Sequence, residues 1–204
     1  YNAKDSFNKA IEIIENDSSK NFSQNKKNRN SNPELSSSAK KMLMESISSS
    51  NIVLQKYPKS KYVDDAIYYI GRSHFSLGEI YKAQKSFTKI INQFPDSEYY
   101  YESQLWLAYS YLKLNLVDSS FLKVNKIEND FLKSDKKLND EISFLFHDLK
   151  GEILIQLQKY DEAFIEFDKS LELIKSKTKK TMMYSKLSMI SESIGEFEKS
   201  IDYL

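Results

Sequence analysis

Residues 64–97 decide the fold, and they read DDAIYYIGRSHFSLGEIYKAQKSFTKIINQFPDS. Apolar side chains recur there every three or four residues in two stretches, which is the pattern of one buried face on each of two helices. The first stretch contains Ile67, Ile70, His74 and Leu77, and the second contains Ile80, Ala83, Phe87, Ile90 and Phe94. Gly78 and Glu79 separate them, and Pro95 ends the second because proline cannot continue the hydrogen-bond ladder. The segment therefore predicts two short helices that need each other for stability.

The composition favours an all-α protein with a core. The chain has 204 residues, of which 40% are hydrophobic and 13% aromatic, but only 4 Gly and 3 Pro, which is few for a sandwich, a barrel or a glycine-rich nucleotide fold. A total of 30 Lys+Arg against 29 Asp+Glu gives no electrostatic case for nucleic acid or anionic lipid as the main partner. The lack of Cys excludes disulfides, cysteine zinc sites and a cysteine nucleophile.

The helix pair recurs along the chain with decreasing regularity. Each recurrence has a small residue on its first helix, which we call the anchor residue: Gly71, Ala108, Gly151 and Ser188. A glycine inside a helix costs about 1 kcal/mol relative to alanine, so it needs a packing reason. We expect Gly71 and Ala83 to let the two helices of their pair approach closely. The uneven anchor spacing predicts a longer helix or connection around residues 129–140.

Two more helices are expected upstream. Residues 1–15 form an amphipathic pattern, and residues 35–57 form a long one that Pro58 closes. Residues 16–34 are polar and rich in Asn, Ser and Lys, and we predict that they form a disordered or mobile insertion.

The predicted organisation is a degenerate helix pair over 1–57, including that insertion, followed by a repeat array over 58–204. The array units are expected at about 64–97, 101–134, 144–177 and 181–204. Because the chain opens at Tyr1 rather than Met and stops at Leu204 inside a helical pattern, we interpret it as a trimmed piece of something longer, with a truncated last unit.

The pattern resembles a tetratricopeptide repeat. The residues that carry the resemblance are Ile67, Ile70, Gly71, His74, Ala83, Phe87 and Pro95. It implies an all-α fold, a right-handed α-solenoid of antiparallel helix pairs with about nine or ten helices. Within residues 54–114, KYPKSKYVDDAIYYIG and QFPDSEYYYESQLWLA are also similar to BamD-like outer-membrane-assembly lipoproteins and to the Tol–Pal-associated repeat protein.

The same resemblance implies a binding groove on the first helices of the pairs. It assigns to that groove Tyr68, Arg72, Phe75, Tyr109, Lys113 and Glu152. Rigid aromatic side chains mixed with charges suit the binding of a peptide or helix. The alternative is that some of these side chains contact the neighbouring repeat instead. The Tyr99–Tyr101 run poses a similar choice between packing under the next repeat and forming an exposed patch.

Nothing in the sequence indicates catalysis. His74 replaces a packing tyrosine, and His147 next to Asp148 lacks a nucleophile at any defined spacing. There is no HExxH or EF-hand pattern, and many carboxylates stand at helix starts, where the helix dipole favours them. We therefore expect no catalytic residue, no metal site and no cofactor.

The sequence and the resemblance together predict a non-enzymatic scaffold that binds a protein or peptide partner and no nucleic acid. The resemblance implies a bacterial envelope complex on the periplasmic side of the outer membrane, with membrane attachment only through a lipid anchor outside residues 1–204. The resemblance is also compatible with an oligomer of this chain. The alternatives are a cytoplasmic adaptor, a self-assembling structural module, and a regulatory repeat domain of a larger protein.

Overall fold

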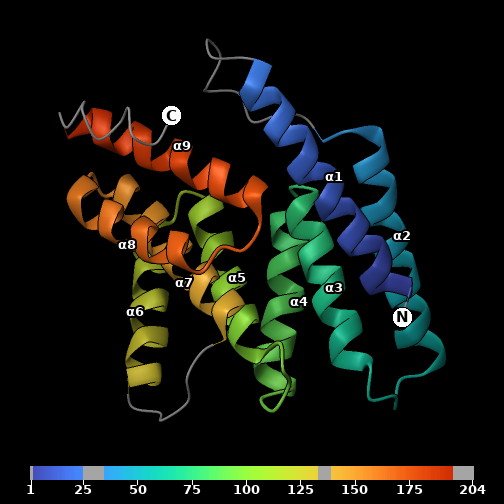
Figure 1. Ribbon diagram of the computed structural model, residues 1–204. Helices are drawn as coiled ribbons and strands as arrows, with labels where there is room; N and C mark the ends of the chain where they lie inside the picture. The colour runs from blue at the N-terminus through green and yellow to red at the C-terminus, as the bar shows by residue number, and fades with distance from the viewer. Residues whose placement is uncertain (1, 25–34, 133–138, 195–204) are drawn as a thin grey trace. The chain divides into compact units, whose positions relative to one another are not determined.

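The computed structural model describes residues 2–24, 35–132 and 139–194, and every regular element in these ranges is an α-helix (Figure 1). In chain order the helices are α1 (Asn2–Gln24), α2 (Ser37–Lys56), α3 (Val63–Ser76), α4 (Ile80–Gln93), α5 (Tyr100–Lys113), α6 (Val117–Leu132), α7 (Asp140–Gln156), α8 (Tyr160–Glu172) and α9 (Lys177–Ser193). The predicted all-α class is confirmed. The right-handed winding of the whole array stays a prediction.

The anchor glycines let the two helices of a pair come into close contact. A Cβ atom on Gly71 of α3 would lie 2.8 Å from Cε1 of Phe87 on α4, and one on Gly151 of α7 would lie 2.7 Å from Cε1 of Phe167 on α8. Both phenylalanines are completely buried. The close approach of α3 to α4 that the sequence predicted is therefore confirmed, and α7 with α8 repeats it.

Turn and cap residues set the helix limits. Gly78, Asn115 and Gln158 stand at equivalent turns within the pairs and have φ angles of 77°, 59° and 59°, the left-handed conformation that ends a helix. The side chain of Asn139 accepts a 2.8 Å hydrogen bond from the N–H of Ile142 and so caps the start of α7. Helix α2 ends two residues before Pro58, as the sequence predicted.

Helix α1 corrects the expected limits of the polar insertion. It continues through residues 16–24, which we had predicted to be disordered. This stretch contains neither Gly nor Pro, and each residue added to an existing helix gains a hydrogen bond at a cost of only a few tenths of a kcal/mol for ordinary residues. Residues 25–34, the rest of the predicted insertion, lie outside the described residues.

The chain divides into two compact units, Tyr1–Ser110 and Tyr111–Leu204, so the division falls inside α5 and not after residue 57. The reason is that α1 and α2 pack on each other and on α3, which places the degenerate first pair in the same unit as the first clear repeat. In the second unit, α7, α8 and α9 enclose a core that includes Leu154, Phe167, Met183, Leu187 and Ile190.

Candidate partner-binding face

The first helices of the pairs carry the predicted groove residues, and we call the surface that they form within each unit the A-helix face of that unit. In the first unit it is formed by α1, α3 and α5, and Arg72 of α3 lies at its centre. The guanidinium carbon of Arg72 lies 3.8 Å from the ring centroid of Trp106 on α5 and 5.0 Å from that of Phe7 on α1. Arg72 Nη1 also donates a 2.8 Å hydrogen bond to the hydroxyl of Tyr68. One arginine therefore links three A helices.

Tyr68 belongs to the packing between α3 and α5. Its hydroxyl donates to the carboxylate of Glu102, and its ring stacks on that of Tyr99 with centroids 4.1 Å apart. The side chain is only 3% exposed. Burial raises the pKa of Tyr68 above its usual value, and the nearby charge of Glu102 adds to that rise. Tyr68 therefore stays protonated and acts as a hydrogen-bond donor.

Burial corrects the expected groove lining. Tyr68 and Tyr109, at 3% and 8% exposure, do not line an open surface. The alternative prediction, that some of these side chains contact the neighbouring repeat, is correct for Tyr68. Arg72 and Phe75 are half-buried and remain on the accessible part of the face in the first unit. Lys113 is exposed at the end of α5, in the part of that helix that belongs to the second unit.

The tyrosine run Tyr99–Tyr101 stands at the start of α5. Its first residue, Tyr99, is packed and does not form an exposed patch. Tyr99 is 8% exposed, and its hydroxyl donates a 3.2 Å hydrogen bond to Asp65 on α3. Burial, followed by the charge of Asp64, raises the pKa of Asp65. Packing is therefore confirmed for Tyr99, but against α3 of the preceding repeat and not under the next one.

In the second unit a lysine joins two A helices. The Nζ of Lys186 on α9 lies 2.6 Å from a carboxylate oxygen of Asp148 and 2.6 Å from one of Glu152, both on α7. Burial lowers the pKa of Lys186, but the charges of Asp148 and Glu152 outweigh burial and keep the pKa above the usual value. The predicted groove residue Glu152 is thus half-buried and ion-paired within the chain.

The two links use equivalent repeat positions. One partner of each link directly follows an anchor residue. The other partner stands on the next A helix, two residues before the anchor residue of that helix. The two pairs are Arg72 with Trp106 and Glu152 with Lys186. Our sequence reasoning missed Trp106 and Lys186, although their common distance from the anchor residues was a usable signal.

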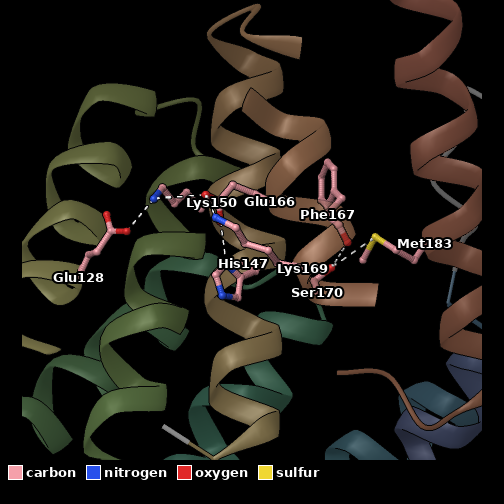
Figure 2. Close-up of polar contacts among 8 residues, drawn as sticks. All are labelled: Glu128, His147, Lys150, Glu166, Phe167, Lys169, Ser170 and Met183. Atoms are coloured by element: carbon pink, nitrogen blue, oxygen red, sulfur yellow. Dashed lines mark hydrogen bonds and ion pairs between the residues drawn. The ribbon is translucent and has the colours of Figure 1, made fainter. Parts of the chain in front are cut away.

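The other charged cluster of the second unit lies between α6, α7 and α8 (Figure 2). Glu166 of α8 is buried and accepts hydrogen bonds from His147 Nδ1 at 2.7 Å and from Lys169 at 3.2 Å. Lys150 Nζ lies 3.4 Å from Glu166 and 2.8 Å from Glu128 on α6. Burial alone would raise the pKa of Glu166, but the hydrogen bond from His147 and the charge of Lys150 outweigh burial and lower it to about 2.

Both histidines have structural partners. His147 is hydrogen-bonded to Glu166 rather than to its sequence neighbour Asp148. His74 Nδ1 lies 2.5 Å from Glu79, which also pairs with Lys82 at the start of α4. Within the described ranges, no group of three or more His, Cys, Asp or Glu side chains could hold a metal ion. A search of the same residues finds no helix with the length and apolar character needed to span a membrane.

Comparisons with known proteins agree with the helix pairs. The tetratricopeptide repeat family matches residues 65–97 and again residues 146–177. No curated protein matches the chain. A similarity to the BamD-like or Tol–Pal-associated proteins is therefore not confirmed.

Solved structures resemble the fold at low sequence identity. A tetratricopeptide repeat protein of Thermus thermophilus gives a TM-score of 0.59 at 14% identity over 80% of both chains. A crystal structure of MamA gives 0.53 at 13% identity, over 80% of this chain and 85% of that one. A repeat protein of Parabacteroides merdae gives 0.51 at 18% identity, over 98% of this chain and 64% of that one. Residues 65–97 and 146–177 of this chain are therefore similar to tetratricopeptide repeats, a class of repeat that generally mediates protein–protein interaction without catalysis.

Proposed function

We propose that the protein is a non-enzymatic scaffold whose A-helix face binds a peptide or helix of a partner protein. The observation that carries the proposal is the cluster of Arg72, Phe75 and Trp106, which places a cation and two large rings on one half-exposed surface of a tetratricopeptide repeat. Arginine and tryptophan are the residues most enriched among those that dominate binding energy at protein interfaces.

The chemistry of this surface favours a partner segment that brings acceptor oxygens. The Nε of Arg72 and the Nε1 of Trp106 have no hydrogen-bond acceptor in the described part of the chain. Both atoms are buried, so carbonyl or carboxylate oxygens of a partner supply the missing hydrogen bonds only if the two side chains move outward on binding. In the second unit, Glu152 contributes to binding only if a partner displaces or shares its ion pair with Lys186.

For the cellular setting, we propose a bacterial envelope complex at the periplasmic side of the outer membrane, reached through a lipid anchor outside residues 1–204. The support is the similarity of residues 54–114 to envelope repeat proteins. Mass spectrometry of the native N-terminus from membrane and soluble fractions tests the setting. A lipid-modified residue upstream of Tyr1 in the membrane fraction supports it. An unmodified chain in the soluble fraction overturns it and leaves a cytoplasmic adaptor.

Photo-crosslinking in native cells tests the binding face. A photoreactive phenylalanine analogue replaces Phe75 on the A-helix face of the first unit, and in a matched variant it replaces Tyr81, which is 70% exposed on α4. We expect the Phe75 position to crosslink to a partner protein, identified by mass spectrometry, and the α4 position not to. Crosslinks that form only from Tyr81 would overturn the proposed face.

A further inference from the structure

Two loops of the first unit have the same backbone. Residues 57–62 (YPKSKY) join α2 to α3, and residues 94–99 (FPDSEY) join α4 to α5. In both, the fourth residue donates its N–H to the carbonyl of the first, between Ser60 and Tyr57 at 2.9 Å and between Ser97 and Phe94 at 3.1 Å. The same serine side chain accepts from the N–H two residues later, at 3.3 Å in one loop and 3.2 Å in the other.

The two loops carry opposite charges at matching positions. Lys59 and Lys61 of the first loop correspond to Asp96 and Glu98 of the second. All four side chains are exposed. We call residues 57–62 the basic loop and residues 94–99 the acidic loop. Because the backbone is shared, the charge difference comes from the side chains and not from the fold.

The loops are neighbours at one end of the first unit. The hydroxyl of Tyr99, in the acidic loop, reaches Asp65 in the first turn of α3, three residues after the basic loop ends. Figure 1 shows both loops at the lower end of α2, α3 and α4. This end of the unit is therefore a strip with positive charge on one side and negative charge on the other.

The basic loop also exposes aromatic surface where the acidic loop does not. Tyr57 and Tyr62 are 60% and 45% exposed, whereas Tyr99, which corresponds to Tyr62, is 8% exposed. Lys61 lies over the Tyr62 ring, 5.1 Å from its centroid. Exposed tyrosines beside charges are typical of surfaces that become buried on association.

We propose that this strip is a self-association surface, and that its occupant is the same strip of a second copy of the chain. A two-fold axis across the strip sets the basic loop of each copy against the acidic loop of the other, so that both loops are matched at once. Lys59 and Lys61 then face Asp96 and Glu98 twice in one contact. The same arrangement covers Tyr57 and Tyr62.

A uniformly anionic surface fits the strip less well. A membrane or a nucleic acid that approaches the two lysines also meets the two carboxylates of the neighbouring loop, and the attraction and repulsion largely cancel. An interface of two short loops per copy belongs to the small, transient class, and its exposed charges make it sensitive to salt.

Charge exchange between the loops tests the proposal in the full chain. Variant K59D/K61E makes both loops acidic, and variant D96K/E98K makes both loops basic. The combined variant, with all four substitutions, again has one acidic and one basic loop, but with the charges exchanged between the loops. Each change introduces side chains that the same backbone already carries in the other loop. The control K85D/K89E alters the net charge as K59D/K61E does, but on exposed positions of α4. Sedimentation equilibrium up to about 1 mM protein measures association, in the range where weak dimers form, and circular dichroism checks folding.

We expect the wild-type chain and the control to dimerise. K59D/K61E alone and D96K/E98K alone should each lower the association constant at least about tenfold, because like charges then face each other. The combined variant should recover the association constant, because opposite charges face each other again. An equimolar mixture of the two two-fold variants should also associate. Raising NaCl from about 0.1 M to about 1 M should weaken every one of these dimers. A monomeric wild-type chain, a dimer indifferent to the loop changes, a control as weak as K59D/K61E, or binding to anionic vesicles without self-association would overturn the proposal.

Discussion

Arg72 lies over the ring of Trp106, with the guanidinium carbon 3.8 Å from the ring centroid, and the two side chains join helices α3 and α5 across the repeat boundary. The same arginine contacts Phe7 and donates a hydrogen bond to Tyr68. Glu152 and Lys186 hold the equivalent positions in the second unit and are joined by an ion pair. Neighbouring A helices are thus connected at one repeat position by different chemistry in each unit.

The first prediction concerns the coupling between Arg72 and Trp106. Replacing Arg72 with Met and Trp106 with Phe, singly and together, should give a coupling free energy of about 0.5–2 kcal/mol in urea unfolding, because a partly desolvated cation over an indole ring is attracted by its π-electrons. Trp106 is the only tryptophan, so its fluorescence should change in Arg72→Met before unfolding begins. Lys89→Met, an exposed position on α4, is the control and should leave the fluorescence unchanged. Strict additivity of the two changes would contradict the prediction.

The second prediction concerns Gly71. A new Cβ there would lie 2.8 Å from Phe87 and 2.9 Å from the Cβ of Ser86, so Gly71→Ala should lower the free energy of unfolding by about 1 kcal/mol or more, since overpacking exceeds the gain in helix propensity. Gly151→Ala should behave in the same way against Phe167. Asn51→Ala, exposed on α2, should be neutral or slightly stabilising. A Gly71→Ala protein more stable than wild type in urea would show that the pair can relax without cost.

The third prediction concerns pH. The pKa of Glu166 is about 2 in the folded chain against 4.5 for an ordinary glutamate. A folded-state pKa below the unfolded one means that this group stabilises the fold above about pH 4.5 and that its contribution disappears as the pH falls toward 2, by up to about 3 kcal/mol. Urea unfolding between pH 6 and pH 3 should therefore show a shallower loss of stability for Glu166→Gln than for wild type. Glu162→Gln, at an exposed ion pair with Lys159, should follow the wild-type slope.

The fourth prediction concerns Lys186. Lys186→Met leaves Asp148 and Glu152 next to each other on α7 without their common cation, and it should destabilise the chain by about 1–3 kcal/mol at pH 7. Lys177→Met, on the exposed first turn of α9, is the matched control. If both lysine variants lose the same stability, the link between α7 and α9 contributes nothing.

The helix pairs could be predicted from residues 64–97 because their pattern is local. A spacing of three and four residues acts within one or two helices, as do the small anchor residues and the prolines that follow α2 and α4, and the helix pairs follow from these signals. The polar segment after residue 15 shows the limit, since α1 runs on to Gln24. The prediction of disorder rested on the number of polar residues in the segment. An existing helix, however, can extend through polar residues as long as no helix-breaking residue interrupts it.

The binding face was harder to predict because a repeat position does not determine exposure. Tyr68 and Phe75 lie two turns apart on the same face of α3, yet Tyr99 and Glu102 cover Tyr68 and leave Phe75 half-exposed. Trp106 and Lys186 escaped notice for the same reason: their importance comes from Arg72 and Glu152, which lie on other helices.

The sequence by itself determined the all-α class, the pairing of helices through Gly71 and Gly151, and the similarity of residues 65–97 and 146–177 to tetratricopeptide repeats. Only the tertiary structure decided which side chains of the A helices contact the neighbouring repeat and which remain accessible to a partner. The physical reason is that periodicity arises within a helix, whereas burial, ion pairing and the pKa of a group such as Glu166 depend on side chains that packing brings from distant parts of the chain.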